Sequence, residues 1–305
     1  MLVIYHRADL DGITSAAIVK KWYDQSYPGI EKEPLVLFGI DYGEAPPTDL
    51  IKPGEKTFIV DFSFEMDVLF ELGQLAGPGN LVWIDHHQTA IEEFEKVEKT
   101  RRNFVSVLPF TRAKISACEL VWGYLFPYER MPLAIEYLGK YDTWRNGNQV
   151  EWENEILPFQ YAMRVVCNSP EKFPAYLLTP EWNKDSIVLM AMGKGVLLYQ
   201  EQQDAYLCKR IAFGGKFCGL HALFINALGF SSNSWKSIFD PSRHKILVSF
   251  HYTGQHWKYS LRTADESVNC AELAAIYGGG GHKKAAAFRW NCPAQEAEFY
   301  SRHIK

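Results

Sequence analysis

In the stretch LVWIDHHQT, residues 81–89, four apolar residues are followed directly by an aspartate and two histidines. A short apolar run of this kind is typical of a buried strand. The end of a strand needs a turn residue, and Asp85 alone would serve. A single histidine is more often a satisfied core residue than a ligand. His86 and His87, side by side after Asp85, favour a chemical function as much as a structural one.

The segments before this stretch alternate between strand-like and helix-like patterns. Strands are expected at Leu2–Tyr5, Leu35–Ile40 and Thr57–Val60. A helix is expected at residues 13–24, after the first strand, and another at residues 64–75, before the strand at residues 81–84. Strands separated by helices of this length predict an α/β fold, with a parallel sheet covered by helices on both faces. In such sheets the ligand site lies beyond the carboxyl ends of the strands.

The chain length predicts two domains, because 305 residues exceed what one hydrophobic core usually supports. We expect an α/β domain at residues 1–183, a connecting helix at residues 184–212 and a smaller α+β domain at residues 213–305. In the last of these, β-like segments precede a short helix that begins at Asn269. The pattern Asn-x-x-Glu at that point resembles a capping box.

Composition and charge restrict the function. A net charge of −4 without a long basic tract disfavours a grip on long nucleic acid and favours a small or short anionic ligand. The six scattered cysteines form no C-x-x-C pair and indicate free thiols in a reducing compartment. The sequence shows no signal peptide and no run near the ~18 apolar residues of a membrane span. We therefore expect a cytoplasmic protein with no membrane partner.

Acidic residues follow two further strands. The motif HRADLDG, residues 6–12, comes directly after the first strand and contains His6, Asp9 and Asp11. Asp61 comes directly after the strand that ends at Val60. Taken singly, each acid has an ordinary explanation, as a helix N-cap or as a turn residue at the end of a strand.

A fourth acid lies on the apolar face of a predicted helix at residues 132–144. Asp142 follows Ile135 and Leu138 on that face, where a carboxylate costs free energy unless it is paired. A salt bridge is the alternative explanation. Because the carboxyl ends of parallel strands converge on one crevice, we expect a single metal site. Its candidate ligands are His6, Asp9, Asp11, Asp61, His86, His87 and Asp142.

The types of these side chains indicate which ions would bind. Mixed imidazole and carboxylate ligands without thiolates favour Mn²⁺, Fe²⁺, Co²⁺ or Zn²⁺ over Mg²⁺ and Ca²⁺, which prefer oxygen ligands. There are enough ligands for two ions. A pair of ions about 3.5–4 Å apart is the arrangement used in phosphoester hydrolysis, where it neutralises charge on the attacked phosphate.

The run GGGGHKK, residues 278–284, holds more glycine than the end of a helix needs. Gly278 alone would form the C-cap. Further glycines followed by a histidine and lysines predict a cradle of backbone amides and cations for a phosphate or carboxylate. An arginine in the strand-like segment YSLRT would add a bidentate contact. The residues expected at this anion site are Arg262, Gly279, Gly280, Gly281, His282 and Lys283.

Five motifs in this order resemble the DHH phosphoesterase family. They are HRADLDG, Asp61, the DHH at residues 85–87, Asp142 in YLGKYDTW, and GGGGH at residues 278–282. The C-terminal part resembles the DHH-associated domain of the branches similar to nanoRNase/pAp-phosphatase and to RecJ. The resemblance covers nearly the whole chain. It implies a binuclear Mn²⁺ site in the first domain, a substrate-binding second domain and an active site in the cleft between them.

The resemblance also implies roles for single residues. His6 and Asp9 would bind one ion, Asp11, His86 and Asp142 would bind the other, and Asp61 would bridge the two. Asp85 would orient its loop, and His87 would face the substrate phosphate or the attacking water. Asp61, His86 and His87 are thus the expected catalytic residues. In many nanoRNase-like members a histidine lies four residues before the first acid, whereas His6 precedes Asp9 by three, so its role as a direct ligand stays open.

The expected function is a metal-dependent phosphohydrolase, with two Mn²⁺ ions and with Co²⁺, Mg²⁺ or Zn²⁺ as substitutes. Expected substrates are oligoribonucleotides, dinucleotides or pAp-like bisphosphates, cleaved by a monomer or homodimer. The GGGGH motif argues against an exopolyphosphatase or pyrophosphatase. The negative charge and the lack of an added oligonucleotide-binding module argue against a RecJ-like single-strand exonuclease. The complete set of ligand positions argues against a non-catalytic binder.

Overall fold

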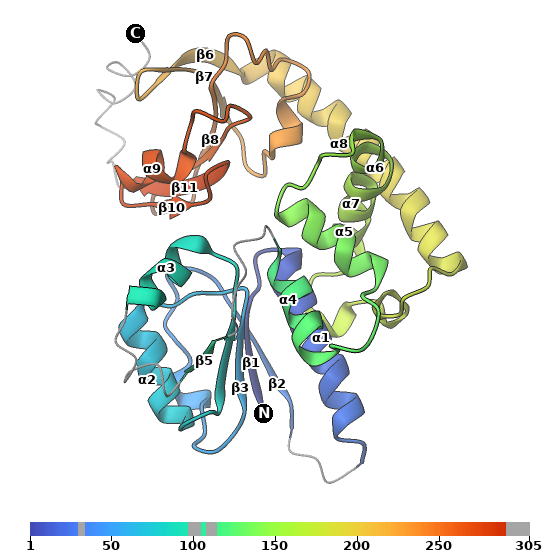
Figure 1. The fold of residues 1–305 in the computed structure, drawn as a ribbon. Coiled ribbons are helices and arrows are strands. Elements are labelled where there is room, and N and C mark those ends of the chain that lie inside the picture. The colour runs from blue at the N-terminus through green and yellow to red at the C-terminus, as the bar shows by residue number, and fades with distance from the viewer. Residues whose placement is uncertain (30–33, 97–104, 108–114, 291–305) are drawn as a thin grey trace. The chain divides into compact units, whose positions relative to one another are not determined.

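A parallel sheet of five strands forms the centre of the first part of the chain (Figure 1). The computed structural model describes residues 1–29, 34–96, 105–107 and 115–290. The strands are β1 (Leu2–His6), β2 (Val36–Ile40), β3 (Thr57–Val60), β4 (Leu81–Ile84) and β5 (Val105–Val107), in the order β2-β1-β3-β4-β5. The predicted parallel sheet is confirmed. Strand β5 was not predicted, because three residues are too short to show a period.

Helices cover both faces of this sheet, as predicted (Figure 1). Helices α2 (Met66–Ala76) and α3 (Gln88–Lys96) cover one face, and α1 (Leu10–Ser26) and α4 (Ala117–Leu125) cover the other. Beyond α1 and α4 lie α5 (Leu133–Asp142), α6 (Gln149–Glu151) and α7 (Leu157–Val166). Short turns of 3₁₀-helix lie at Thr48–Leu50, Pro170–Lys172 and Ala175–Leu178, and a π-helical turn lies at Trp152–Ile156. The segment before α4, residues 108–114, lies outside the described residues.

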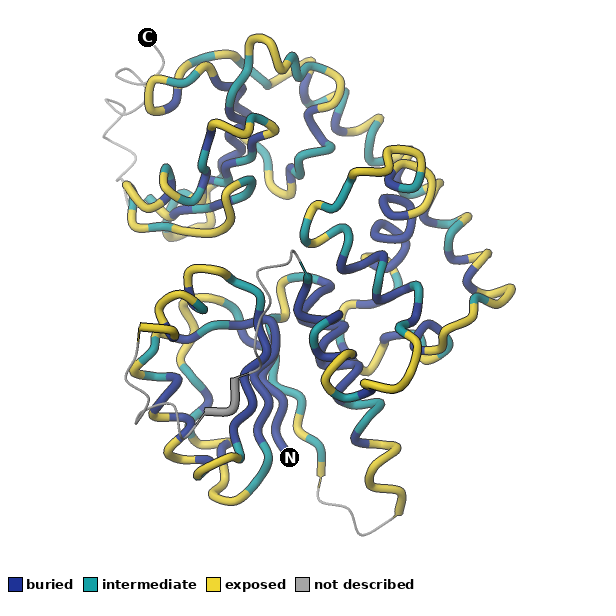
Figure 2. The backbone as a smooth tube through the Cα atoms, in the orientation of Figure 1, coloured by how far each residue is buried: buried dark blue, intermediate teal, exposed yellow. Residues whose placement is uncertain are grey.

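Alternate residues of the strands enter two separate cores. Val3 and Val60 pack with α1, α4, α5 and α7 on one face of the sheet. Ile4, Ile59 and Trp83 pack with α2 and α3 on the other. Because both faces of β1, β3 and β4 are buried, the sequences of these strands are continuous apolar runs. Figure 2 shows them buried along their length, so the polar residues that follow them are held at a rigid edge.

A long helix, α8 (Lys184–Ile211), follows the first part of the chain. The predicted helix in this region is confirmed, and Gly193 lies inside it. A Cβ atom at Gly193 would stand 2.0 Å from the carbonyl oxygen of Pro158, so glycine allows α8 to pack closely against α7. The chain divides into two compact units, Met1–Leu197 and Leu198–Lys305, and the division falls within α8.

The second unit contains a sheet of six strands in the order β10-β11-β9-β8-β7-β6. The strands are β6 (Phe213–Phe217), β7 (Leu220–Asn226), β8 (Ile246–Tyr252), β9 (Trp257–Arg262), β10 (Gly280–Gly281) and β11 (Ala285–Trp290). Strands β7 and β8 pair in parallel, and the other pairs are antiparallel. A 3₁₀ turn lies at Ser232–Trp235, and α9 (Cys270–Ala275) packs on the sheet. Asn269 caps α9 as predicted, accepting from the amides of Ala271 and Glu272.

Two further expectations concern the whole chain. Across the described helices, none has the length and apolar character needed to span a membrane. The five cysteines within the described residues are all free thiols, in agreement with the scattered pattern of the sequence.

Candidate metal centre

The turn from β1 into α1 brings His6 and Asp9 together. Asp9 is the N-cap of α1 and accepts a hydrogen bond from the amide of Gly12 at 3.0 Å. A Cβ atom at Gly12 would stand 2.0 Å from the carbonyl oxygen of His6, so only glycine lets the helix begin this close to the strand. As a result, Nδ1 of His6 lies 2.9 Å from Oδ2 of Asp9.

Asp11, in the first turn of α1, is held by a second helix. Its Oδ2 accepts from the amide of Ala117 and its Oδ1 from the amide of Cys118, both at 2.8 Å. These amides belong to the first turn of α4, where unpaired N–H groups and the helix dipole favour a negative charge. The carboxylate of Asp11 is buried and fixed in orientation.

Asp61 follows β3 and adopts a left-handed backbone conformation, with φ of 53°. This conformation costs a residue with a side chain about 1–2 kcal/mol. Its carboxylate is buried between two histidines: Oδ1 lies 3.4 Å from Nε2 of His86, and Oδ2 lies 3.7 Å from Nδ1 of His6. Among the residues that the structure describes, none donates a hydrogen bond to the buried Oδ2.

Asp85 organises the two histidines that end β4. It is completely buried, and its Oδ1 accepts from the amides of His86 and His87 and lies 2.6 Å from Nδ1 of His87. Its Oδ2 accepts from the hydroxyl of Ser63. Burial acts to raise the pKa of Asp85, but the charge and hydrogen bond of His87 outweigh it and lower that pKa. Asp85 thus remains ionised and fixes the direction of the His87 ring.

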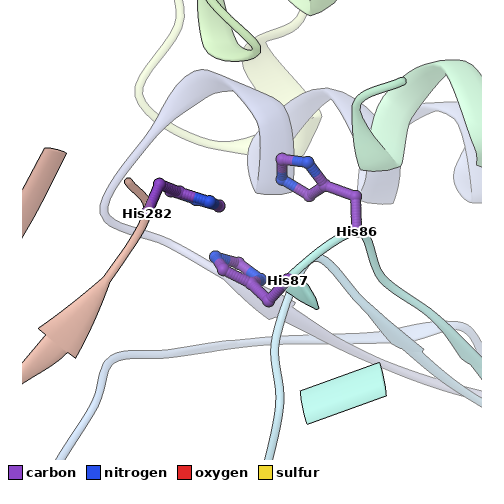
Figure 3. Close-up of side chains that lie close together, drawn as sticks. All are labelled: His86, His87 and His282. Atoms are coloured by element: carbon purple, nitrogen blue, oxygen red, sulfur yellow. The ribbon is translucent and has the colours of Figure 1, made fainter. Parts of the chain in front are cut away.

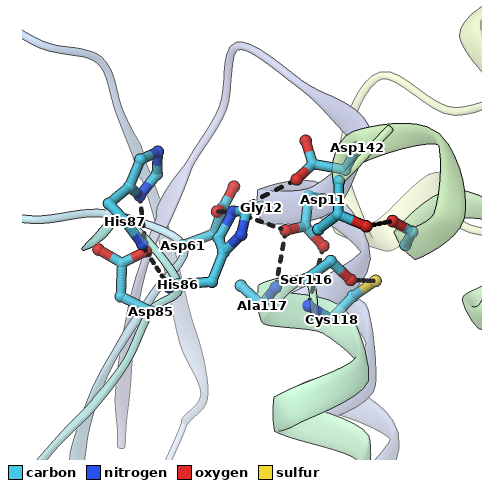
Figure 4. A network of polar contacts seen from close by, with 12 residues as sticks. Asp11, Gly12, Asp61, Asp85, His86, His87, Ser116, Ala117, Cys118 and Asp142 are labelled. Atoms are coloured by element: carbon cyan, nitrogen blue, oxygen red, sulfur yellow. Dashed lines mark hydrogen bonds and ion pairs between the residues drawn. The ribbon is translucent and has the colours of Figure 1, made fainter. Parts of the chain in front are cut away.

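The rings of His86 and His87 diverge from the end of β4 (Figure 3). Their centroids are 5.0 Å apart and their planes are inclined by 50°. Nε2 of His86 points to the acids, 3.3 Å from Oδ2 of Asp142 and 3.6 Å from Oδ2 of Asp11. Figure 4 shows His86 among these carboxylates and His87 on Asp85. The two adjacent histidines therefore contact different groups: His86 faces the carboxylates of Asp11 and Asp142, and His87 contacts Asp85.

The side chains predicted as ligands converge on two adjoining groups. In each group one ligand atom per residue lies within 4.8 Å of the others. The first group is His6, Asp9 and Asp61, and the second is Asp11, His86 and Asp142. Asp61 also reaches His86 and so adjoins both groups. Asp142 was expected to face inward from α5. It is the last residue of that helix, and its side chain is 27% exposed at the rim of the site.

The electrostatics of the site fit a divalent cation. Burial, and then the charges of Asp11 and Asp9, raise the pKa of Asp61 well above its usual value. Burial and the charge of Asp11 raise the pKa of Asp142 to about 7. Burial acts to lower the pKa of His6, but the nearby carboxylates of Asp61 and Asp9 outweigh it and raise that pKa to about 10. Without a metal, protons thus compensate the crowded carboxylates, and a divalent cation would replace them.

Known proteins similar to this chain were found by sequence and by structure. No family model matches the sequence. The chain is 22% identical over 306 residues to an uncharacterised protein of Acanthamoeba polyphaga mimivirus, covering 95% of this chain and 67% of that protein. It is 26% identical over 243 residues to the oligoribonuclease NrnB of Bacillus subtilis, covering 75% of this chain and 58% of NrnB.

Solved structures match over almost the whole chain. The DHH domain of a protein described as a member of a ribosomal-protein family has a TM-score of 0.61 at 12% identity, covering 98% of this chain and 84% of that one. RecJ from Thermus thermophilus in complex with Mn²⁺ has a TM-score of 0.52 at 16% identity, covering 99% and 51%. The chain has the fold of a DHH-family protein. The resemblance stated from the sequence is thereby confirmed at the level of fold.

Behind the ligand groups of this DHH fold lies a network that the sequence analysis missed. Ser116 caps α4, and Oε2 of Glu119 accepts from the amide of Ser116 at 3.1 Å in a capping box. Arg145, which follows α5, forms an ion pair with Glu119. A Cβ atom at Gly139 in α5 would stand 2.3 Å from Oε2 of Glu119. The pattern Ser-x-x-Glu at residues 116–119 was the available sequence signal for this cap.

An aromatic pair lies beside His6 in the same unit. Tyr42 stacks on Phe62, with ring centroids 4.6 Å apart and planes inclined by 26°. The centroid of the His6 ring is 5.5 Å from that of Tyr42. Tyr42 is 43% exposed, so part of this aromatic pair is open to solvent next to the ligand groups.

The glycine run of the second unit has a structural role that the sequence did not reveal. A Cβ atom at Gly279 would stand 2.2 Å from the carbonyl oxygen of Ala287, and one at Gly281 would stand 2.7 Å from that of Ala285. These glycines let β10 pack closely onto β11. The amides of Gly278, Gly279 and His282 already donate to carbonyl groups of the chain. The expected cradle therefore depends on its side chains more than on these amides.

The cations expected at the anion site lie close to this turn. Arg262 ends β9 and is directly opposite Ala285 of β11, and its Nη1 donates to the carbonyl oxygen of Leu261. Nζ of Lys283 lies 3.6 Å from the exposed carboxylate of Glu266. His282 is exposed in the turn between β10 and β11. The role of these residues in binding a substrate stays a prediction.

Proposed function

We propose that this chain is a metal-dependent phosphoesterase that cleaves phosphoester bonds of short nucleotides. The observation that supports this proposal most directly is the position of Asp61, whose two carboxylate oxygens face the histidines of two adjoining ligand groups. A carboxylate in this position suits a bridge between two cations about 3.5–4 Å apart. The named relatives support nucleotides as the substrate class, because NrnB is an oligoribonuclease and a structure of TM-score 0.50 is a pGpG-specific phosphodiesterase of Vibrio cholerae.

Two Mn²⁺ ions are the proposed cofactor. His6 and Asp9 would hold one ion, Asp11, His86 and Asp142 the other, and Asp61 both. Imidazole combined with carboxylates and no thiolate fits Mn²⁺ better than Mg²⁺, and Co²⁺, Zn²⁺ or Mg²⁺ would substitute. When bound, such a pair supplies a water-derived nucleophile at neutral pH and neutralises charge on the phosphate.

His87 is the proposed partner of the substrate within the first unit. Its Nδ1 donates to the buried Asp85, so Nε2 is the ring nitrogen directed to other groups. Burial acts to lower the pKa of His87, but the charge and hydrogen bond of Asp85 outweigh it and raise that pKa. A ring that keeps its proton donates a hydrogen bond to a phosphate oxygen. Asp85 would position this contact.

The second unit is proposed to bind the substrate through His282, Lys283 and Arg262. Two exposed or half-buried cations and an imidazole next to a tight turn suit a terminal phosphate. Gly279, Gly280 and Gly281 would contribute by allowing the turn to approach closely. In this proposal residues 1–183 form the catalytic domain, residues 184–212 the connecting helix and residues 213–305 the substrate-binding domain.

The proposal is tested by incubating the purified protein with Mn²⁺ and a panel of substrates. The panel contains a labelled dinucleotide, a five-residue RNA, pAp, a cyclic dinucleotide, long single-stranded DNA and polyphosphate. We expect mononucleotides to be released preferentially from the short nucleotide substrates. The matched control is Asp61→Asn, which keeps the shape of the side chain and removes its charge. Hydrolysis of polyphosphate alone, or of long DNA in preference to the dinucleotide, would overturn the proposal.

A further inference from the structure

An open depression of 320 Å³ lies at β6, an edge strand of the sheet in the second unit. Four basic side chains line it: Lys216, His221, Arg243 and His244. They come from β6, from β7 and from the loop before β8, so the fold gathers them from separate segments. We call this group the basic pocket. Its volume lies in the range of small-ligand sites.

The sheet register places two of these basic side chains opposite each other. Lys216 and His221 are directly opposite each other on the antiparallel strands β6 and β7, so both side chains point to the same face. Both offer N–H donors there, which suits an anion between them. Gly214, two residues before Lys216, lies on the same side of β6, and a Cβ atom there would meet nothing within 4 Å. The strand therefore leaves space beside Lys216.

The loop before β8 completes the pocket with two further donors. Nδ1 of His244 accepts from the amide of Asp240 at 3.1 Å, so Nε2 carries the hydrogen of the neutral ring. Burial, and then the charge of Arg243, lower the pKa of His244 and favour that neutral form. The carboxylate of Asp240 accepts from the amide and hydroxyl of Ser242.

The charges of the pocket are only partly compensated by the described residues. Asp240 interacts electrostatically with Arg243, but neither Lys216 nor Arg243 forms an ion pair across the described residues. Other cations of the same unit do: Lys245 lies 2.6 Å from Asp265, and Lys284 lies 2.9 Å from Glu266. Some positive charge is thus left open at the β6 edge.

The pocket and Arg262 share one side of the sheet. The register runs in a single row from Arg262 through Leu247 and Leu223 to Gly214, which lines the pocket. Residues directly opposite each other point to the same face. Three strand spacings separate β9 from β6, which is about 14 Å. Leu247 and Leu223, in the middle of this row, are buried with Cys208, Phe230 and Trp235, so a strand that reaches both ends has to pass around this cluster. A dinucleotide, with its single internal phosphodiester, is too short to do so, whereas a longer strand can.

We propose that the basic pocket binds a backbone phosphate of an oligonucleotide strand whose end is held at Arg262. The pocket would thus favour strands longer than a dinucleotide. This inference rests on the proposed function, because it takes a short nucleotide strand as the substrate. The double variant Lys216→Gln/Arg243→Gln tests it. The matched control is Lys236→Gln, an exposed lysine of the same unit whose charge is already paired with Glu201 at 3.8 Å.

Binding is measured by fluorescence anisotropy of an end-labelled ten-residue RNA in EDTA, where no metal-dependent cleavage occurs. We expect the double variant to bind about 10-fold more weakly, because both cations that contact the phosphate are lost. The slope of log K against log salt should become shallower by about 0.7, the value for one neutralised phosphate on a single strand. The charge-preserving variant Lys216→Arg/Arg243→Lys should bind like the wild type. Wild-type affinity and slope in the Gln double variant would overturn the proposal.

Two further measurements distinguish a failure of the pocket proposal from a failure of the proposed function. With Mn²⁺ present, the double variant should hydrolyse the dinucleotide with unchanged kcat/KM and the ten-residue RNA with a raised KM. Competition by AMP or inorganic phosphate as strong as that of the RNA would assign the pocket to a free phosphate ligand and overturn the strand assignment. If the wild type cleaves no nucleotide at all, the proposed function fails, and anisotropy still decides whether the pocket binds phosphate.

Discussion

Oδ1 of Asp61 lies 3.4 Å from Nε2 of His86, while the other oxygen of the same carboxylate faces His6. The contact joins the end of β3 to the end of β4, two neighbouring strands whose carboxyl ends meet at one edge of the sheet. The left-handed backbone of Asp61 turns the side chain into this position. That conformation costs about 1–2 kcal/mol locally, which the surrounding packed structure has to offset.

Replacing Asp61 by Ala should remove nearly all activity and lower the occupancy of both metal ions, because a bridging ligand serves both. Asp142→Ala should lower the occupancy of one ion, since Asp142 contacts the second group alone. Metal content is measured by mass spectrometry after dialysis against Mn²⁺. Asp24→Ala, an exposed acid paired with Lys20, is the control. Full activity in Asp61→Ala would rule out a binuclear site.

The pH dependence of stability should reverse when metal is bound. The pKa of His6 is raised to about 10 and that of Asp142 to about 7 in the metal-free fold. Groups with a raised pKa contribute stability that is complete below their unfolded values and is lost as the pH rises through the folded ones. In EDTA, the melting temperature should therefore fall as the pH rises from about 6 to 9.

With Mn²⁺ present the melting temperature should instead rise or stay level over the same pH range, because the cation replaces the protons and binds more tightly as they leave. Differential scanning fluorimetry with and without Mn²⁺ measures both series. His6→Asn should flatten the fall of the metal-free melting temperature above pH 7, since it removes a group whose pKa is raised to about 10. Equal slopes with and without metal would show that these groups do not bind the ion.

Much of this site follows from strand ends alone. His6 and Asp61 come directly after apolar runs, His86 follows one residue later, and parallel strands bring such residues to one edge whatever the rest of the chain does. The ion pair between Glu119 in α4 and Arg145 after α5 joins residues 26 positions apart, and no period in the sequence records it. The glycine run was interpreted chemically, and close packing of Gly279 against Ala287 gives it a structural role as well. The pattern of residue types along the chain does not distinguish these causes.

His282→Ala should raise the KM for a dinucleotide about 10-fold or more and leave metal content unchanged. The side chain belongs to the second unit, whereas all the ligands proposed for the two ions belong to the first, so its loss should remove a substrate contact alone. Kinetics are compared with metal analysis on the same preparation. His256→Ala, in the turn between β8 and β9, controls for the loss of a histidine. Loss of bound metal in His282→Ala would show that its assignment to the substrate is wrong.

Gly139 is not a predicted ligand, but Gly139→Ala should reduce activity because it disturbs the helix end that holds Asp11. The added Cβ would stand 2.3 Å from Oε2 of Glu119 and 2.6 Å from Oγ of Ser116, so the capping box of α4 must open. Loss of a cap costs about 1 kcal/mol. The amides of Ala117 and Cys118, which hold Asp11, belong to the same first turn of the helix. We expect weaker Mn²⁺ binding together with a lower melting temperature.

The control for this change lies in the helix that carries the cap. A Cβ atom at Gly123 of α4 would meet nothing within 4 Å, so Gly123→Ala should stabilise the helix by about 0.5–1 kcal/mol and leave metal binding unchanged. Titration of Mn²⁺ against both variants, with urea unfolding in EDTA, separates stability from affinity. If Gly139→Ala lost stability but bound Mn²⁺ as tightly as the wild type, the cap of α4 would support the fold without positioning Asp11.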